Sequence, residues 1–332
     1  MYHSNHIPPV LSMRFLNDLY NRSVSYTRNE AEIVNIEKYI NYLEDYILGL
    51  QQIGFMNSEN EDFILSQIAQ INVIRSLPPQ NRGIYGATTA DNSIYLNPDL
   101  HGNGILSNEE RIRLYTFHEL GHLVHGMYQD DIQKYVESMS RKYSLSQRNR
   151  KYLEMGFDLI DEACVQETAE NLAYKYARKQ RPQFRQYSPK NRNNGKNLYG
   201  NFNVLSNFDY YVELEAPAVM LTKTMRGIGT NQKDRNLGTL MSQLAQRSFN
   251  PDFIKDLSRE FLEDGYERDL VLIMHRMGII KDASYGMFGM AEFNDSMDLA
   301  PEAFNTLRNR TTELTDWRPR VRRSGQSGIE SR

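Results

Sequence analysis

The sequence contains a single cysteine, Cys164, so no disulfide can form within the chain and the fold needs no oxidising compartment. It has no apolar run near the ~20 residues that a transmembrane helix requires. Its first residues lack the basic start and the apolar stretch of a signal peptide. These absences predict a cytoplasmic protein without a membrane partner.

Neither sign of charge dominates, because 39 Lys and Arg stand against 42 Asp and Glu, which gives a formal net charge of −3. This balance argues against nucleic acid as the main partner, since binding to phosphates depends on a strongly basic surface. With 332 residues, of which 40% are hydrophobic, the chain can bury the core of one large domain or two smaller ones.

The N-terminal part of the chain has the apolar spacing of two amphipathic helices. The first is expected to start at a capping box formed by Thr27 and Glu30 and to end near Gly54. The second is expected to start in the same way at Ser58 and Glu61, and Pro78-Pro79 are expected to end it. We expect the two helices to form an antiparallel hairpin.

The remaining pattern adds a small amount of strand and several more helices. Residues 83–98 read as two short strands around a turn at Asp91 and Asn92. Further helices are expected at about 108–128, opened by a capping box of Ser107 and Glu110, and at about 150–180, 203–226 and 251–278. The predicted fold class is therefore α+β and predominantly helical.

The helix expected after Ser107 contains His118-Glu119-Leu120-Gly121-His122. Two histidines four residues apart lie on one face of a helix, so both imidazoles can bind one ion at ~2.0–2.1 Å. Glu119 is then next to the ion without occupying its coordination sphere, which is the arrangement of zinc hydrolases. The pattern predicts a zinc site with His118 and His122 as ligands.

A catalytic zinc site needs a third protein ligand and one open position. His125 is not expected to be that ligand, because it lies seven residues, or ~10.5 Å along the helix, from His118. It is interpreted either as a residue that supports the site or as a merely structural one. Glu162 on the next long helix is the favoured third ligand, with Glu167 and Glu170 as alternatives. Gln166 shares a helix face with Glu162 and is expected to donate to a ligand or to substrate.

The strand–helix–helix arrangement with these residues resembles the gluzincin group of zinc metallopeptidases, the thermolysin-like enzymes. Ile160-Asp161-Glu162-Ala163 is similar to the Asn-Glu-Ala/Gly stretch around the ligand glutamate of that group. The gluzincin aspartate four residues after that ligand is replaced here by Gln166. A weaker similarity, carried by Gly83-Ile84-Tyr85-Gly86 with Ile94-Tyr95-Leu96, links the chain to the lethal-factor-type toxin peptidases.

The resemblance implies a zincin-like metallopeptidase domain over 81–316. The apolar spacing makes 1–80 an N-terminal helical region, and the basic composition of 317–332, rich in Gly and Ser, predicts a disordered tail. The resemblance also implies a zinc-dependent endopeptidase-like hydrolase that acts on a peptide or protein substrate, with Zn2+ as cofactor and Glu119 as general base. Tyr210 and Tyr211 are the first candidates for stabilising the oxyanion, and His275 is the next candidate. The strand before the motif is expected to bind the substrate main chain by edge addition.

Two hypotheses from other classes remain open. In the first, the scaffold is catalytically inactive and binds a protein partner. In the second, the acid-free basic stretch 178–196 binds nucleic acid, although a surface loop is the favoured interpretation of that stretch. Cys164, on an apolar helix, is expected to be a buried small residue rather than a ligand or a nucleophile.

Overall fold

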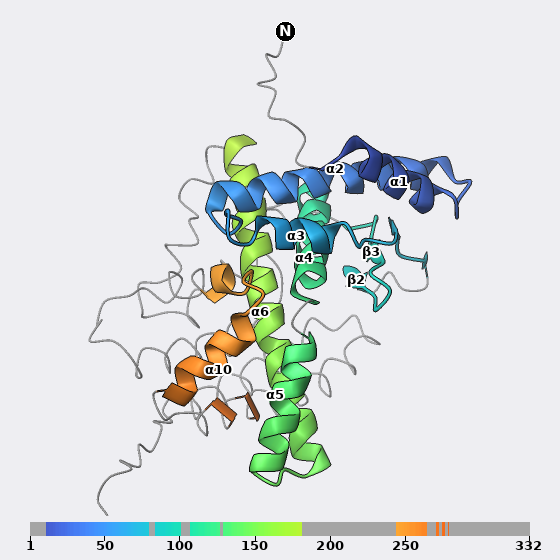
Figure 1. Cartoon of the computed structure of the whole chain (residues 1–332). Helices are drawn as coiled ribbons and strands as arrows, with labels where there is room; N and C mark the ends of the chain where they lie inside the picture. Colours follow the sequence, from blue (N-terminus) through green and yellow to red (C-terminus); the bar gives the residue numbers. More distant parts are fainter. Residues whose placement is uncertain are drawn as a thin grey trace, which may run out of the picture.

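The computed structural model describes residues 11–79, 84–100, 107–126, 129–180 and 244–263, and also residues 270, 271, 274, 275 and 278. In this part of the chain the structure is mostly helical and has one small three-stranded sheet (Figure 1). The predicted α+β, predominantly helical class is confirmed at this level. In chain order the elements are α1 (Met13–Val24), α2 (Glu30–Ile53), α3 (Glu61–Ile68), β1 (Ile74–Ser76), β2 (Gly86–Thr88), β3 (Ile94–Leu96), α4 (Asn108–His125), α5 (Gln129–Lys142), α6 (Gln147–Gln180) and α10 (Phe253–Glu263).

The first predicted helix is present as α2, but its start differs from the prediction. Asn29 is the N-cap, and its side chain accepts a hydrogen bond from the backbone N–H of Ala31. The Thr27 hydroxyl oxygen instead accepts from the backbone N–H of Asn29, so the predicted capping box of Thr27 and Glu30 is wrong. Gly54, with φ 76°, ends the helix in the left-handed conformation that glycine adopts without strain.

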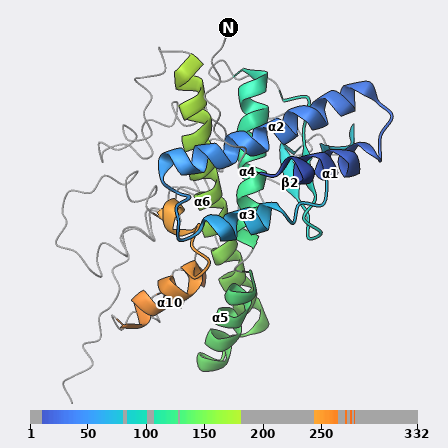
Figure 2. The same ribbon diagram turned by 45° about the horizontal axis from the view of Figure 1, so that its top comes forward.

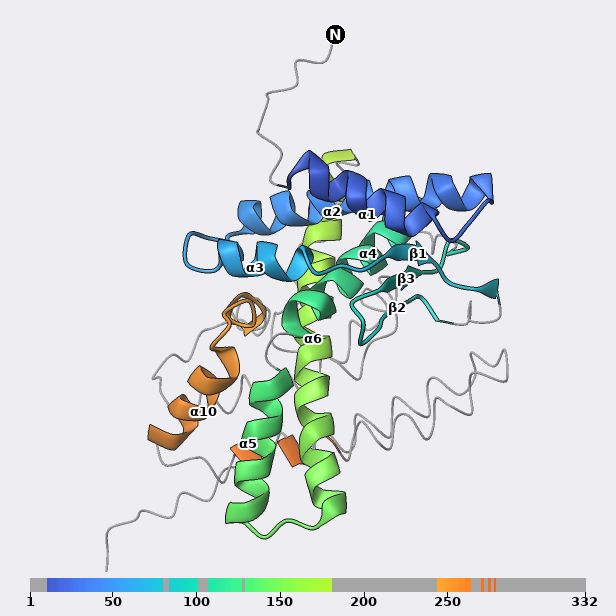
Figure 3. The same cartoon turned by 45° about the vertical axis from the view of Figure 1, so that its right-hand side comes forward.

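The second predicted helix is too long, because α3 stops at Ile68 and Ile74 begins strand β1. Arg22 explains the break, since its guanidinium donates to the carbonyl oxygens of Ile71 and Asn72, each at 2.9 Å. Arg22 lies on α1, a helix that the sequence analysis did not predict. The expected antiparallel arrangement is present, because the chain turns after α2 and α3 runs back in the opposite direction (Figures 1 and 3), but α2 packs mainly on α4 and β1 while α3 packs on α4.

The sheet has the order β1-β3-β2, with β1 parallel and β2 antiparallel to the central strand β3 (Figure 3). The two strands predicted within 83–98 are confirmed as β2 and β3. Asn92 in the turn between them has φ 61°, and the Asp91 carboxylate accepts hydrogen bonds from Thr89 and Ser93. These side-chain bonds are typical of a tight turn and fix the register of the two strands. Strand β2 is an edge of this sheet and lies beside α4.

Helix α6 is the long element around which the other helices are arranged (Figures 1 and 2). Helix α4 packs along one part of it, and α5 packs along another part as the partner of a helical hairpin that the sequence analysis missed. The predicted helices at 108–128 and 150–180 are confirmed as α4 and α6, and the capping box of Ser107 and Glu110 is present. The predicted helix at 203–226 lies outside the described residues, and α10 covers part of the helix predicted at 251–278.

One hydrophobic core joins these elements, from Leu19 of α1 to Met274 near the end of the described residues. It includes side chains on both sides of residue 80, and the proposed domain boundaries stay predictions. None of the helices in the described ranges has the length and apolar character needed to cross a lipid bilayer.

Helices α4 and α6 approach closely where Gly121 faces Val165. A Cβ atom added to Gly121 would lie 2.8 Å from Val165 Cγ1, whereas one added to Gly126 would meet nothing within 4 Å. We therefore expect Gly121→Ala to destabilise the protein by about 1–2 kcal/mol, because the overpacking exceeds the gain of about 1 kcal/mol in helix propensity. Thermal unfolding would measure this, with Gly126→Ala as the control. Equal stability of the two variants would contradict the close packing.

Candidate metal centre

Helix α4 places His118 and His122 on its side facing α6. The capping box fixes the start of this helix, and its core-facing residues, such as Leu114 and Phe117, bury the helix beneath α2 and the sheet. The two imidazoles are one helical turn apart, and their Nε2 atoms are 3.0 Å from each other. Their rings are almost perpendicular, with an interplanar angle of 82°.

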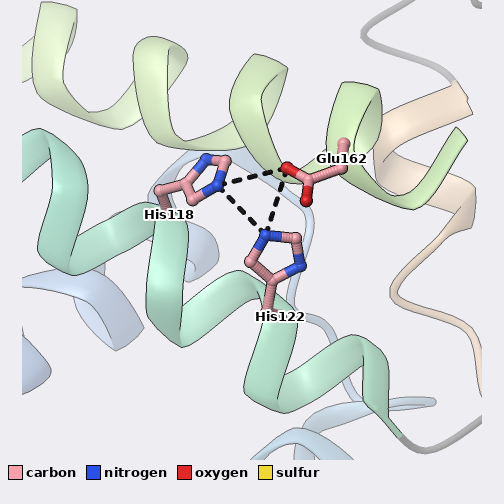
Figure 4. A group of neighbouring side chains, drawn as sticks. All are labelled: His118, His122 and Glu162. Atoms are coloured by element: carbon pink, nitrogen blue, oxygen red, sulfur yellow. Dashed lines mark hydrogen bonds and ion pairs between the residues drawn. The ribbon is translucent and has the colours of Figure 1, made fainter. Parts of the chain in front are cut away.

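Helix α6 supplies the third group, Glu162. Its Oε2 atom lies 3.4 Å from His118 Nε2 and 3.3 Å from His122 Nε2 (Figure 4). The structure thus brings together the three residues that the sequence analysis named as metal ligands. Among the described residues, they form the cluster whose geometry suits a metal ion.

The spacing of the three donor atoms fits a tetrahedral zinc site. Ligand atoms at ~2.05 Å from a tetrahedral ion are about 3.3 Å from one another. The observed separations are 3.0, 3.3 and 3.4 Å. Three atoms that all offer lone pairs repel one another unless a cation lies between them, so this triangle requires either a proton or a metal. Two imidazole nitrogens and one carboxylate oxygen are a donor set that zinc prefers.

The pKa shifts within the cluster also indicate that a positive charge, from a proton or a metal, is needed there. Burial alone would lower the pKa of His122, but the neighbouring carboxylates of Glu162 and Asp161 outweigh it and raise the pKa well above its usual value. Burial opposes ionisation of Glu162, yet the two imidazoles hold the pKa of its carboxyl well below its usual range. The cluster therefore favours an ionised carboxylate beside a positive charge, which is the charge arrangement that a divalent cation would stabilise further.

Asp161 is the functional residue that the sequence analysis missed. Its Oδ2 atom lies 2.9 Å from His122 Nδ1, and its Oδ1 atom lies 2.8 Å from His125 Nδ1. Hydrogen bonds from both histidines outweigh burial and lower the pKa of the Asp161 carboxyl, so it is an ionised acceptor. Both Nδ1 atoms must then donate, which leaves the Nε2 lone pair of His122 for a metal. Asp161 directly precedes the predicted ligand Glu162 in the sequence, and this adjacency is the signal that could have identified it as a partner of the histidines.

The other polar residues on α6 lie outside the donor triangle. Gln166 donates to Glu170 at 2.9 Å, and Glu167 accepts from Asn171 at 3.0 Å. Among the described residues, Gln166 bonds to Glu170 and not to His122, and the carboxylate at His122 Nδ1 is that of Asp161, the residue before Glu162. Cys164 is fully buried, and burial raises the pKa of its thiol, as expected of a core residue.

Glu119 is held from the side of the sheet. The Thr88 hydroxyl of strand β2 lies 2.8 Å from Glu119 Oε2 and 2.9 Å from the Glu119 carbonyl oxygen, so it can donate to either. Gly86 of the same strand lies so close that an added Cβ atom would be 2.7 Å from Glu119 Oε1. Strand β2 therefore fixes the conformation of the predicted general base.

Of the predicted oxyanion residues, Tyr210 and Tyr211 lie outside the described residues. His275 does not lie at the donor triangle, because its ring contacts Asn149 at 3.2 Å and packs edge-on against Tyr152. These two residues precede Glu162 on α6 by ten or more positions, which corresponds to about 15–20 Å along the helix axis. The alternative that His275 stabilises the oxyanion is therefore wrong.

Comparison with protein-family models, curated proteins and solved structures finds no match for this chain. The gluzincin resemblance therefore stays a prediction that rests on the residues quoted for it.

Metal binding should depend on Glu162. We expect the metal-depleted protein to take up about one zinc ion per chain, and Glu162→Gln to lower the zinc affinity at least tenfold because it removes a charged ligand. Competition with a chromophoric chelator would measure both values. Glu154→Gln is the matched control, since Glu154 lies on the same helix and pairs with Arg150. Equal affinity in Glu162→Gln and in the control would exclude Glu162 as a ligand.

Proposed function

We propose that this protein is a zinc-dependent peptidase whose metal is held by His118, His122 and Glu162. The single observation that supports this most is the donor triangle of 3.0–3.4 Å, which has a carboxylate, Glu119, on the residue next to a ligand. A purely structural zinc site has four protein ligands, whereas three ligands leave one position for water or substrate. Among the described residues, the cluster has three.

A bound zinc ion would supply Lewis acidity, lowering the pKa of a water molecule and polarising the scissile carbonyl. Glu119 would accept the proton of the attacking water and donate it to the leaving amine. Its carboxylate is suited to this role because it is only 5% exposed and is held by the hydroxyl of Thr88. A fixed base needs no reorganisation before it accepts the proton.

Strand β2 would connect this chemistry to the substrate. It is an edge strand of the three-stranded sheet, and its residues Gly86 and Thr88 contact Glu119. An extended peptide that pairs with the outer edge of such a strand uses main-chain hydrogen bonds, so it can be bound with little regard to its side chains. The same strand would then position both the substrate and the base.

Glu119→Gln should separate metal binding from catalysis. We expect this variant to keep the zinc affinity of the wild type and to lose peptide cleavage by about 10²–10⁴-fold, because an amide cannot accept the proton. Mass spectrometry of a peptide library would measure cleavage, and chelator competition would measure zinc affinity. Glu137→Gln, on the surface of α5, is the control.

Two results would contradict the proposal. If Glu119→Gln cleaves peptides as well as the wild type does, Glu119 is not the base. If the zinc-loaded wild type cleaves no peptide but binds a protein partner, the inactive scaffold is the better description.

Thr88 allows a finer test of the same site. We expect Thr88→Val to lower kcat about tenfold with little change in zinc affinity, because the near-isosteric side chain removes the hydrogen bond to Glu119 and leaves the ligands in place. Thr88→Ser, which keeps the hydroxyl, should retain most of the activity. Steady-state kinetics of both variants would measure this, and an equal loss in the two would show that the hydroxyl has no role.

A further inference from the structure

The hairpin of α5 and α6 has an excess of positive charge around its turn. Residues 138–153 contain five Lys and Arg and no Asp or Glu, although the whole chain has a formal net charge of −3. The turn lies at the end of the hairpin that is far from the sheet and from α1 (Figures 1 and 3). Four of the five cations are exposed, and we call them the basic tip: Arg141, Lys142, Arg148 and Lys151.

Arg150, the fifth cation, has a structural role that also occupies the nearest acids. Its guanidinium pairs with Glu154 of α6 at 3.0 Å and with Glu137 of α5 at 3.6 Å, so it links the two helices. These are the first carboxylates on either side of the turn, five residues before the end of α5 and seven after the start of α6. The hairpin therefore has no carboxylate of its own between Arg150 and its end.

Helix stability explains only half of the basic tip. Arg141 and Lys142 lie in the last turn of α5, where the helix dipole favours cations. Arg148 and Lys151 lie at the start of α6, where the dipole disfavours them. The helices α2, α3, α4 and α5 each have two acidic residues in their first turn, whereas α6 has none. The positive charge at this end of α6 is therefore not explained by the helix itself, which favours an anionic partner outside the chain.

The arginines of the basic tip keep most of their donors available to such a partner. Arg141 donates from Nε to the carbonyl oxygen of Glu137 at 3.4 Å, and Arg148 donates from Nε to the hydroxyl of Tyr152 at 2.9 Å. These bonds leave the terminal nitrogens, which bind phosphate in the paired geometry that arginine favours. Within the described ranges, Arg141, Arg148 and Lys151 form no ion pair with a carboxylate.

The basic tip forms a shallow layer across the end of the hairpin. Its members on α5 are the last two residues of that helix, and its members on α6 are among the first five residues. All four Cα atoms therefore lie within about 6 Å of the end, measured along the helix axes. A flat surface that meets the end of the hairpin is then within one Debye length, ~10 Å at 0.1 M salt, of every cation.

The turn itself favours a lipid surface over a nucleic acid. Proteins that bind single-stranded nucleic acid combine a basic groove with aromatic rings that stack on the bases. Here Tyr143 and Leu145 of the turn pack against the hydrophobic core, and the Lys142 ammonium lies over the Tyr143 ring. The basic tip thus provides charge without a stacking platform, and also without an apolar anchor that would enter a bilayer.

We propose that the basic tip is a docking surface for an anionic lipid bilayer, which it meets end-on. The layer of cations is complementary to a plane of negatively charged headgroups, and each cation near such a plane strengthens binding about fivefold. The contact is peripheral and electrostatic, so it needs no membrane-spanning helix. It does not depend on the metal, and metal-depleted and zinc-loaded protein should bind lipid equally.

Cosedimentation of the full chain with vesicles tests the choice of partner. We expect binding to phosphatidylcholine vesicles with about 30% phosphatidylserine at about 0.1 M salt, and loss of this binding near 0.5 M because salt screens the charges. We expect no binding to phosphatidylcholine alone. Equal binding to both kinds of vesicle, or binding to neither, overturns the proposal. If random-sequence RNA or polyglutamate binds to the basic tip while the anionic vesicles do not, the partner is another polyanion and the lipid proposal is wrong.

A double variant locates the contact, which is necessary because residues 178–196 are also rich in Lys and Arg. Arg141→Gln with Lys151→Gln removes one exposed cation from each helix, and we expect it to weaken vesicle binding about 30-fold. The charge-matched control is Arg14→Gln with Arg28→Gln, at exposed positions on and after α1, and it should bind like the wild type.

Unchanged binding in the tip variant, or an equal loss in the control, overturns the location. Thermal unfolding would verify that both double variants fold. If the tip variant does not fold, Lys151→Gln alone decides, with an expected loss of about fivefold. A protein that binds no zinc but docks on anionic vesicles through the basic tip contradicts the proposed peptidase and keeps this inference.

Discussion

The burial of charge between α4 and α6 is the constraint on which the rest of this structure depends. His118, Glu119, His125 and Asp161 are each at most 9% exposed, and Glu162 reaches the same contact from α6. Charged groups at this depth are tolerated only when they are paired or bind an ion. The two helices therefore have to meet in one register, because a shift of one turn would separate every histidine from its carboxylate. Gly121 permits the close approach that this register needs.

The same constraint explains the unusual composition of α6. Besides Asp161, the helix buries Gln166, Glu167 and Glu170, which are residues that normally face water. Each has a side-chain partner one turn away, as in the bonds from Gln166 to Glu170 and from Asn171 to Glu167. Because α6 buries this many polar groups, it has no broad apolar face that could alone determine how it packs in the fold. Its position is determined instead by hydrogen bonds and by the apolar residues of the surrounding core.

Local patterns in the sequence predicted the parts of the fold that local interactions determine. The capping box of Ser107 and Glu110, the turn at Asn92 and the pairing of His118 with His122 all involve residues within four positions of each other. The errors occur where distant contacts override the local pattern. Residues 69–76 have helical apolar spacing but are not helical, and Ile74–Ser76 form β1, because Arg22 binds the carbonyl oxygens of Ile71 and Asn72 and β3 pairs with Ile74. Ser248 contacts His125 across 123 positions, and no spacing rule connects them.

Asp161 and Glu162 show why the identity of a ligand can be predicted more easily than its support. Consecutive residues of a helix point about 100° apart, so two neighbouring carboxylates cannot reach the same atom. Here they contact opposite sides of one imidazole, since Glu162 lies 3.3 Å from Nε2 of His122 and Asp161 lies 2.9 Å from Nδ1. The longer side chain reaches the ring edge that also faces His118, whereas the shorter one reaches the edge that faces His125. Side-chain length therefore assigns the two acids their different roles, and an exchange of the two residues would satisfy neither.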